Sequence, residues 1–249
     1  MEDPLPKWVR QAAGVVELEA AFRAVHQPTD EAVVAEGRNR LRFDEAFALQ
    51  LTMAYRRADA ASHRAVPRTS KSGGLLEAFD ERLPFILTQG QIAVSEEIMA
   101  DLGRNHPMQR LLQGEVGSGK ALVALRAMLA VVDAGGQAGL LAPTEVLAAQ
   151  HVQTITRMLG EMASGGTLGA PEQATGVVLI TGSSPVRRRR EATLQAAAGA
   201  AGIVIGTHAL LSSDVQFADL GLVVVDEQHR FGVEQRAAMT AKADLRPHV

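Results

Sequence analysis

The sequence predicts an α/β protein with a mostly parallel sheet that is covered by helices on both faces and preceded by a helical segment. Three observations support this fold class. Short apolar runs alternate with helical patterns from about residue 81 to residue 249. Two polar motifs directly follow apolar runs, as ligand-binding residues do at the carboxyl ends of parallel strands. The first part of the chain has helical periodicity alone.

The N-terminal part has apolar residues at spacings of roughly three and four between residues 15 and 57. These positions include Leu41, Phe43, Phe47, Leu51 and Tyr55. We expect a helical linker segment over residues 1–57. Residues 58–80 are polar, basic and rich in helix-breaking residues, which predicts a flexible linker.

The predicted sheet lies within residues 81–249, which we expect to form one nucleotide-binding domain. Its expected strands fall within residues 110–113, 139–141, 177–180, 203–205 and 222–225. A helical run of apolar residues begins directly after Lys120. The chain therefore has the order of strand, glycine-rich loop and helix that phosphate binding requires.

The first motif is that glycine-rich loop, in which backbone N–H groups can surround a phosphate and a lysine can reach its oxygens. Its residues are Gly114, Glu115, Val116, Gly117, Ser118, Gly119 and Lys120. The next residue is Ala121, where the usual pattern has a serine or threonine that binds Mg²⁺. Either water takes that place, or nucleotide binding and hydrolysis are weak. An ordinary glycine-rich turn is the alternative that the strand–loop–helix order disfavours.

The second motif is the pair Asp226 and Glu227 at the end of an apolar run. Adjacent carboxylates at this place suit Mg²⁺ and an attacking water. A solvated turn is the usual alternative, but the glycine-rich loop upstream favours a nucleotide site. A zinc site at His229 is disfavoured, because no partner ligands lie at suitable spacing.

The composition excludes several other classes of chemistry. The sequence has no cysteine, which rules out disulfides, thiolate catalysis and cysteine-ligated zinc. Its net charge of −3 argues against a strongly basic nucleic-acid coat. Residues 1–7 lack a signal-peptide pattern, and no run approaches the ~20 apolar residues that cross a bilayer. We expect a cytoplasmic protein without membrane contact.

With these motifs in view, residues 81–249 resemble the superfamily 2 helicases and translocases, and within them the RecG family of branch-migration DNA helicases. The stretches that carry the resemblance are 83–91, 107–120, 142–151, 206–211 and 226–236. The resemblance implies a RecA-like P-loop NTPase domain, ATP and Mg²⁺ as cofactors, and a monomer that acts on branched or duplex DNA. It also implies roles in DNA recombination and repair.

The resemblance implies roles for individual residues of the nucleotide site. Residues 114–121 look like the phosphate loop, with Lys120 also catalytic. Asp226 resembles the Mg²⁺-binding carboxylate, and Glu227 the residue that activates water. Gln228 and His229 resemble residues that couple the γ-phosphate state to DNA. The remaining set, which looks like an adenine-binding Q motif, is Phe85, Thr88 and Gln91. A helix start capped by Thr88 explains this set equally well from the residues alone.

Three further segments resemble DNA-backbone contacts of the family, made by hydroxyls and main-chain N–H groups. Their residues are Pro143, Thr144, Glu145, Thr181, Gly182, Gly206, Thr207 and His208. Helix capping by Thr144 and a strand-end turn at Gly206 are alternatives that can coexist with this role. The basic run 187–190 can also meet phosphates, although a solvated helix face is the better interpretation.

The sequence ends shortly before the place where the family has a Thr-Ala-Thr motif. The resemblance therefore implies a fragment with the linker and the first motor domain, which we do not expect to unwind DNA alone. Three alternatives remain. A transcription-repair coupling translocase has a similar motor, but Glu145 and Gln228 favour the RecG family. A non-catalytic nucleotide- or DNA-binding module agrees with Ala121. A small-molecule kinase would need an acceptor pocket and a lid, which the sequence does not indicate.

Overall fold

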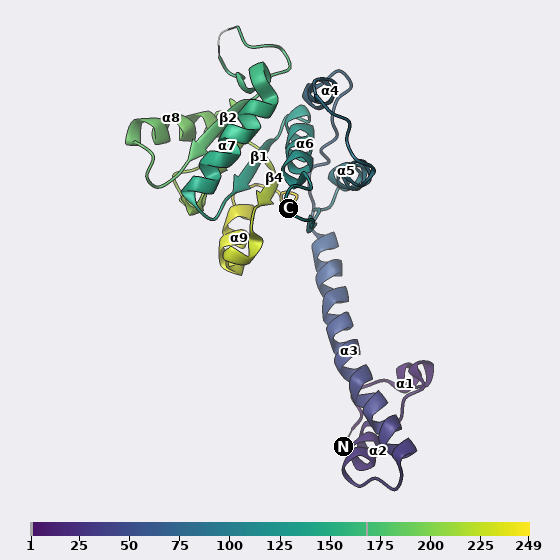
Figure 1. Ribbon diagram of the computed structural model, residues 1–249. Coiled ribbons are helices and arrows are strands. Elements are labelled where there is room, and N and C mark those ends of the chain that lie inside the picture. The colour runs from purple at the N-terminus through teal and green to yellow at the C-terminus, as the bar shows by residue number, and fades with distance from the viewer. Residues whose placement is uncertain (1, 168) are drawn as a thin grey trace. The chain divides into compact units, whose positions relative to one another are not determined.

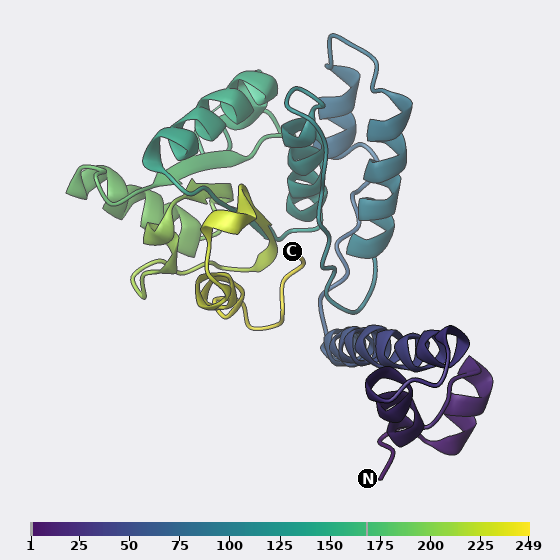
Figure 2. The ribbon, with the colours of Figure 1, turned by 60° about the horizontal axis from the view of Figure 1, so that its bottom comes forward.

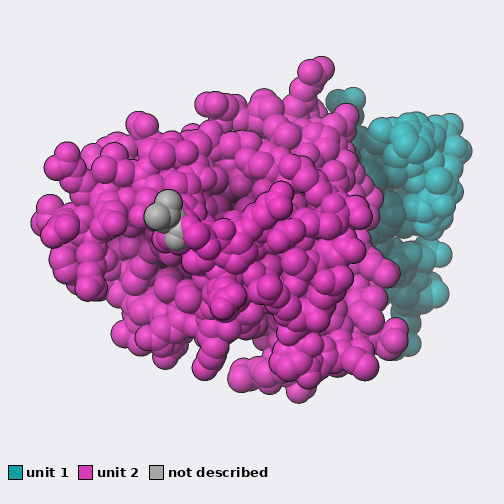
Figure 3. Space-filling model, turned by 90° about the horizontal axis from the view of Figure 1, so that it is seen from above, with its two compact units in different colours: residues 1–60 teal, residues 61–249 magenta. Residues whose placement is uncertain are grey.

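The computed structural model describes residues 2–167 and 169–249, which form two compact units (Figures 1 and 3). Unit 1 is Met1–Ala60 and unit 2 is Ala61–Val249. In the described part of the chain, no helix has both the length and the apolar character needed to span a membrane.

Unit 1 is helical, as predicted. It contains α1 (Lys7–Ala13), α2 (Leu18–His26) and nearly all of α3 (Glu31–Ser62). Helix α1 lies within the predicted helical segment but before residue 15, where the periodic apolar positions begin, because it is only seven residues long. The predicted helical run is interrupted between α2 and α3, where Pro28 cannot continue a helix.

A buried arginine holds unit 1 together. Arg40 is fully buried in α3 and donates two hydrogen bonds to the carboxylate of Asp3, at 2.9 and 2.7 Å. Its Nε also donates to Asp44 at 2.8 Å. This ion pair keeps the pKa of Asp3 far below its usual range. The surface of the unit carries Trp8, the single tryptophan of the sequence, with 71% of its side chain exposed, and the single tyrosine, Tyr55.

Unit 2 is built on a sheet of four parallel strands. These are β1 (Gln137–Leu141), β2 (Gly176–Ile180), β3 (Ala201–Gly206) and β4 (Leu220–Val225), in the spatial order β2-β3-β1-β4. The sequence predicted all four from continuous apolar runs, which strands buried on both faces require. Since the strands are parallel, their carboxyl ends lie at one edge of the sheet.

Helices cover both faces of this sheet (Figures 1 and 2). Helices α4 (Leu75–Glu81), α5 (Gln89–Leu102), α6 (Lys120–Asp133) and α7 (Glu145–Leu159) contribute to one core cluster. Helices α8 (Val186–Ala197) and α9 (Val233–Thr240) contribute to the other. Ile203 and Ile205 face the first cluster and Val204 faces the second, as strand alternation requires. The fold class predicted from the sequence is confirmed. Short 3₁₀ helices complete the unit at η1 (Gly160–Ala163), η2 (His208–Leu211) and η3 (Gln228–Arg230).

The strand predicted at residues 110–113 is not present, and this prediction was wrong. The segment has no regular secondary structure, and Leu111 is 68% exposed. Its main-chain pairing is limited to the region of Arg110, whose N–H donates to the carbonyl of Val249 at 3.0 Å. An apolar run needs a continuous hydrogen-bonded neighbour to become a strand, and this one has a neighbour at one end alone.

The predicted flexible linker also differs from the structure at both of its ends. Residues 58–62 belong to α3, and residues 75–80 lie in α4, where Leu75, Leu76 and Phe79 are buried. The start of α4 is capped by the side chain of Asp133, which accepts the N–H groups of Leu75 at 2.6 Å and Leu76 at 3.0 Å. Asp133 lies at the distant end of α6, so local sequence does not reveal this cap.

Candidate nucleotide and nucleic-acid site

The glycine-rich loop leads directly into α6 and is open to solvent. Gly117 and Gly119 have φ angles of 85° and 84°, a left-handed conformation that glycine adopts without steric cost. The Lys120 ammonium donates to the carbonyls of Gly114 at 2.7 Å and Glu115 at 2.8 Å. Both bonds are to exposed loop residues, so an incoming phosphate can compete for this lysine.

The start of α6 adds a second feature that suits phosphate binding. The first turn of a helix leaves main-chain N–H groups without intrahelical acceptors, and the helix dipole is positive at this end. Ala121 lies in this turn and is exposed. Its methyl group offers no oxygen at the place where the usual loop carries a hydroxyl.

Gln91 connects the predicted adenine-binding segment to the loop. Its amide oxygen accepts the N–H of Thr88 at 2.9 Å, and its own N–H donates to the Thr88 hydroxyl at 3.3 Å, which forms a capping box at the start of α5. The amide nitrogen of Gln91 donates a hydrogen bond to the carbonyl of Ser118 at 3.0 Å, a typical length for such a bond. The capping alternative is therefore confirmed, and the same side chain also reaches the glycine-rich loop. Phe85 lies nearby in sequence with 53% of its side chain exposed.

Asp226 lies at the carboxyl end of β4, directly beside the end of β1. Its N–H donates to the carbonyl of Leu141 at 3.0 Å, and its Oδ2 lies 2.8 Å from Nε2 of His151. The hydrogen bond from His151 is the main cause that lowers the pKa of Asp226, while partial burial opposes it. The positive charge of Lys120 lowers this pKa further, so the two predicted motifs lie within electrostatic reach of each other.

His151 is a site residue that the sequence reasoning missed. It lies in the second turn of α7 and is mostly buried against Asp226. The contact forms because β1 and β4 are adjacent parallel strands, so the first turns of the helix that follows β1 lie beside the end of β4, although α7 itself packs on β2 and β3. A histidine early in the helix that follows a strand could have indicated this contact. The contact can be predicted only if the strand order is known, because that order decides which strand end lies beside the start of α7.

Beyond Asp226, Glu227 and the next three residues are exposed. Glu227 has a φ of 49°, and in the described chain it is the one residue other than glycine with a positive φ. Strained backbone of this kind is common at functional sites. Its Oε2 lies 3.5 Å from Nδ1 of His229. Gln228 and His229 form part of η3 and face solvent.

The side chains present fit a Mg²⁺ ion that is held largely by a nucleotide. Among the described residues, no group of three or more acidic, histidine or cysteine side chains is placed to hold a metal. Mg²⁺ commonly binds one or two carboxylates and completes its shell with substrate phosphates and water. Asp226 provides such a carboxylate, and its other oxygen is not engaged by His151.

The predicted DNA-contact residues at 143–145 and 182 lie together. Thr144 caps α7 by accepting the N–H of Leu147 at 3.2 Å. The carboxylate of Glu145 accepts the N–H of Ser183 at 2.9 Å and also the Ser183 hydroxyl. These hydrogen bonds lower the pKa of Glu145. Through them, the carboxylate of Glu145 links the loop after β1 to the loop after β2. Pro143 is half-buried and Gly182 is exposed.

The other predicted DNA contacts differ in accessibility. Thr181 is buried and its hydroxyl shares a hydrogen bond with Ser184 at 2.8 Å. Thr207 is also buried, and its hydroxyl accepts the N–H of Ala209 at 3.5 Å. Gly206 is buried at the end of β3, whereas His208 is exposed. A DNA contact at either threonine would therefore use main-chain groups or neighbouring residues.

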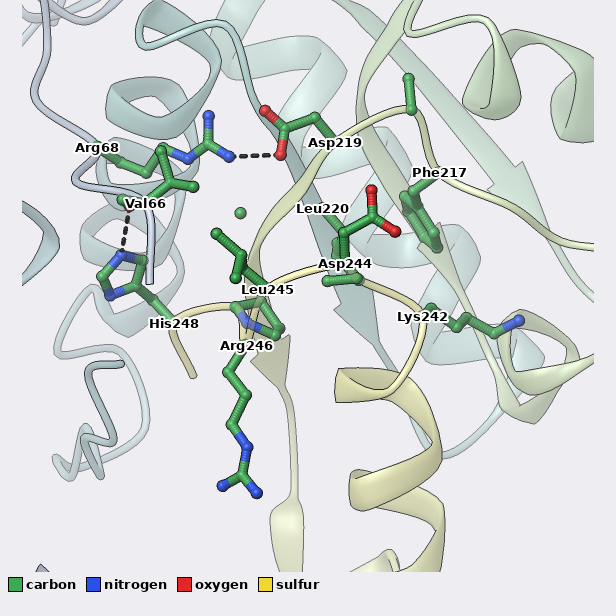
Figure 4. A pocket seen from close by; sticks show the side chains of 14 residues that line it. Val66, Arg68, Phe217, Asp219, Leu220, Lys242, Asp244, Leu245, Arg246 and His248 are labelled. Atoms are coloured by element: carbon green, nitrogen blue, oxygen red, sulfur yellow. Dashed lines mark hydrogen bonds and ion pairs between the residues drawn. The ribbon is translucent and has the colours of Figure 1, made fainter. Parts of the chain in front are cut away.

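A separate cavity of about 220 Å³ lies at the amino end of β4, away from Asp226 at the carboxyl end of that strand (Figure 4). Arg68 and Asp219 form an ion pair at 2.5 Å on its wall. Its Lys242 ammonium donates to the carbonyls of Ser212 and Val215. No residue of the loop or of the acidic motif lines this cavity, so it is not part of the candidate nucleotide site.

The nucleotide motifs and their sheet define a class of protein. The family model described as DEAD/DEAH box helicase matches residues 88–247. The chain belongs to the DEAD/DEAH box helicase family.

Within this class, the chain is similar to RecG proteins along its whole length. It is 49% identical over 251 residues to the ATP-dependent DNA helicase RecG of Mycobacterium tuberculosis, covering 100% of this chain and 34% of that relative. The RecG of Mycobacterium leprae is 47% identical over 249 residues, covering 99% of this chain and 34% of that relative. The chain thus spans about a third of the length of these relatives.

A solved structure of RecG bound to a three-way DNA junction has a similar fold. It matches with a TM-score of 0.79 at 34% identity, covering 93% of this chain and 30% of that chain. The resemblance that the sequence motifs indicated is confirmed by these comparisons.

Proposed function

We propose that this chain provides the linker and the first, ATP-binding motor domain of a RecG-type DNA helicase. The whole protein would use ATP to migrate branched DNA, such as Holliday junctions and stalled forks, in recombination and repair. The observation that carries the proposal is the placement of the two motifs on one parallel sheet: the glycine-rich loop leads into α6, which packs on β1 and β4, and Asp226 directly follows β4 beside the end of β1. We propose a cytoplasmic monomer in which a helical segment precedes one motor domain, and the linker is the stretch between α3 and α4, because both ends of residues 58–80 are helical.

Each site residue then has a defined task. Residues 114–121 surround the phosphates, and Lys120 leaves the loop carbonyls to bind phosphate oxygens. Asp226 would hold Mg²⁺, which would neutralise charge on the phosphates, and Glu227 would orient the attacking water. Gln91, with Phe85 and Thr88, contacts adenine, because an amide offers both a donor and an acceptor. Gln228 and His229 respond to the γ-phosphate.

The proposed DNA surface lies at the same edge of the sheet. It comprises Pro143, Thr144, Glu145, Thr181, Gly182, Gly206, Thr207 and His208, which follow β1, β2 and β3. Contacts from main-chain groups and hydroxyls to phosphates hold DNA without reading its sequence. This arrangement suits a motor that acts on DNA of any sequence.

The decisive experiment is a titration of the chain with a fluorescent ATP analogue, with and without Mg²⁺. We expect saturable binding that Lys120→Ala abolishes, because the lysine is the main cation of the phosphate site. Unchanged affinity in Lys120→Ala would contradict the phosphate-loop assignment. Binding without hydrolysis, even with threonine at position 121 and the rest of the motor present, would favour a non-catalytic nucleotide-binding module, which Ala121 also suggests.

A further inference from the structure

The four consecutive arginines 187–190 form the most basic segment of the chain, and the proposed function leaves them without a role. They lie in the first turns of α8, where Arg189 is half-buried and the other three are exposed. Within residues 2–167 and 169–249, none of the four forms an ion pair or a side-chain hydrogen bond. Their charges are therefore not neutralised by the described protein.

The position of these arginines is electrostatically unfavourable for the protein alone. The amino end of a helix carries the positive end of its dipole, and acidic residues are favoured there. The first turn of α8 contains no acidic residue. Adjacent like charges add a further repulsion. Local choices that conflict with the fold are expected mainly at functional sites, where a partner can offset them.

A groove next to these arginines provides a place for such a partner. It has a volume of about 390 Å³, and its lining includes Arg189, Arg190, Gly182 and Ser184. Its other lining residues are Val186, Thr193, Leu194 and Asp214, so two guanidinium groups and one carboxylate stand on largely apolar walls. The excess of positive charge lies on the side of α8 and favours an anionic ligand there.

The groove adjoins the loop that we assigned to DNA. Residues 181–185 connect the end of β2 to α8, and Gly182 belongs both to the predicted DNA contacts and to the groove. Ser183, beside it, is bonded to Glu145 at the start of α7. The basic groove is therefore continuous with the carboxyl edge of the sheet, where the other proposed DNA contacts lie.

We propose that Arg189 and Arg190 bind the phosphate backbone of duplex DNA in this groove, extending the DNA surface from Gly182 along α8. The inference rests on the proposed function for the direction in which DNA runs. Arginine suits this task because its planar guanidinium can donate two hydrogen bonds to one phosphate. ATP phosphates are not the ligand, since the glycine-rich loop that would bind them does not line the groove.

The test is the affinity of the chain for a fluorescein-labelled DNA duplex, measured by anisotropy without nucleotide at about 50 to 200 mM salt. We compare Arg189→Gln/Arg190→Gln with Arg56→Gln/Arg57→Gln, which removes two adjacent exposed arginines from α3. Loss of two phosphate contacts should weaken binding at least about tenfold at low salt and reduce the slope of log affinity against log salt by about 2. The α3 variant should keep the wild-type slope.

A charge-preserving variant separates electrostatics from folding. Arg189→Lys/Arg190→Lys should retain most of the salt slope, and all variants should retain the ATP-analogue affinity of the wild type. The inference is overturned if the glutamine variant binds DNA with wild-type affinity and slope, if the lysine variant loses as much as the glutamine variant, or if the wild type shows no salt-dependent DNA binding. Failure of the proposed function is seen separately, in the ATP titration of Lys120→Ala.

Discussion

At the scale of single residues, the methyl group of Ala121 separates this phosphate loop from the usual pattern. It lies in the exposed first turn of α6, where a hydroxyl would face the metal that accompanies a nucleotide. In the proposed function Asp226 binds that metal, and among the described residues no group of three acidic, histidine or cysteine side chains is placed to hold one without a nucleotide. The identity of residue 121 should therefore affect metal binding more than nucleotide binding as such.

We predict that Ala121→Thr strengthens Mg²⁺-dependent binding of an ATP analogue by about tenfold, the effect of an added ligand worth ~1.4 kcal/mol. Ala121→Val is the matched control, because valine has the shape of threonine without the hydroxyl. Titrations with Mg²⁺ and with EDTA measure the effect. If both variants and the wild type respond equally to Mg²⁺, residue 121 does not contact the metal.

His151 provides a second prediction at this scale. Its N–H holds one oxygen of Asp226, and partners of metal ligands commonly change metal affinity by about 10- to 100-fold when removed. His151→Ala should weaken Mg²⁺-dependent nucleotide binding by about tenfold and leave binding in EDTA unchanged. His151→Gln, which keeps an N–H donor, should recover most of the loss. Gln153→Ala, an exposed change on the same helix, serves as the control, and an equal loss in that variant would contradict a specific role for His151.

At the scale of elements, the start of α4 depends on a residue of another helix. Two N–H groups of its first turn, from Leu75 and Leu76, donate to the buried carboxylate of Asp133. Residue Gly74 permits this approach, since a Cβ there would lie 2.6 Å from the nearer oxygen of Asp133. The cap therefore fastens the end of α6 to the segment that precedes α5.

We predict that Asp133→Ala destabilises unit 2 by about 2 kcal/mol, because two buried N–H groups lose a charged acceptor. In a domain of this size the loss corresponds to a decrease in Tm of about 4 to 8 °C. Thermal unfolding followed by circular dichroism measures it, with the exposed change Asp244→Ala as the control. Equal Tm values for the two variants would show that the cap contributes nothing.

The sequence predicted those elements whose signal is local and missed those that depend on distant partners. Continuous apolar runs revealed β1 to β4, and Thr88 and Thr144 marked two helix starts that the structure confirms. Residues 110–113 have the same apolar signal as a strand but lack its neighbour. The cap from Asp133 and the contact of His151 depend on which strands and helices are adjacent. The local pattern of polar and apolar residues does not reveal which elements are neighbours.

At the scale of the whole molecule, His248 joins three separate parts of unit 2. Its Nδ1 accepts the N–H of Met108 at 3.1 Å, so the neutral ring carries its proton on Nε2, which lies 3.1 Å from the carbonyl of Val66 (Figure 4). Its main chain pairs with β4 through Gly221 and Val223. Burial lowers the pKa of His248, and the nearby Arg68 adds to this effect.

This geometry predicts a loss of stability in mild acid. The folded pKa lies below the ordinary value of 6.5, so the unfolded chain binds more protons between these two values. The contribution of His248 is therefore complete above about pH 6.5 and declines as the pH falls through the folded pKa, with a slope of at most ~1.4 kcal/mol per pH unit. Urea unfolding between pH 8 and pH 5 measures it. His248→Gln should be less stable at pH 8 but show a flatter pH profile, and an unchanged profile would contradict the assignment.

The placement of Trp8 and Tyr55 has a consequence for spectroscopy. Both belong to unit 1, and each is the single residue of its type in the sequence, whereas all residues of the candidate nucleotide site lie in unit 2. Excitation at about 295 nm, where mainly tryptophan absorbs, therefore excites Trp8 alone, a probe in the unit that does not contain the candidate nucleotide site. A change in tryptophan emission on adding ATP would show that nucleotide binding in unit 2 alters the surroundings of Trp8 in unit 1. Unchanged emission would show that nucleotide binding does not affect those surroundings.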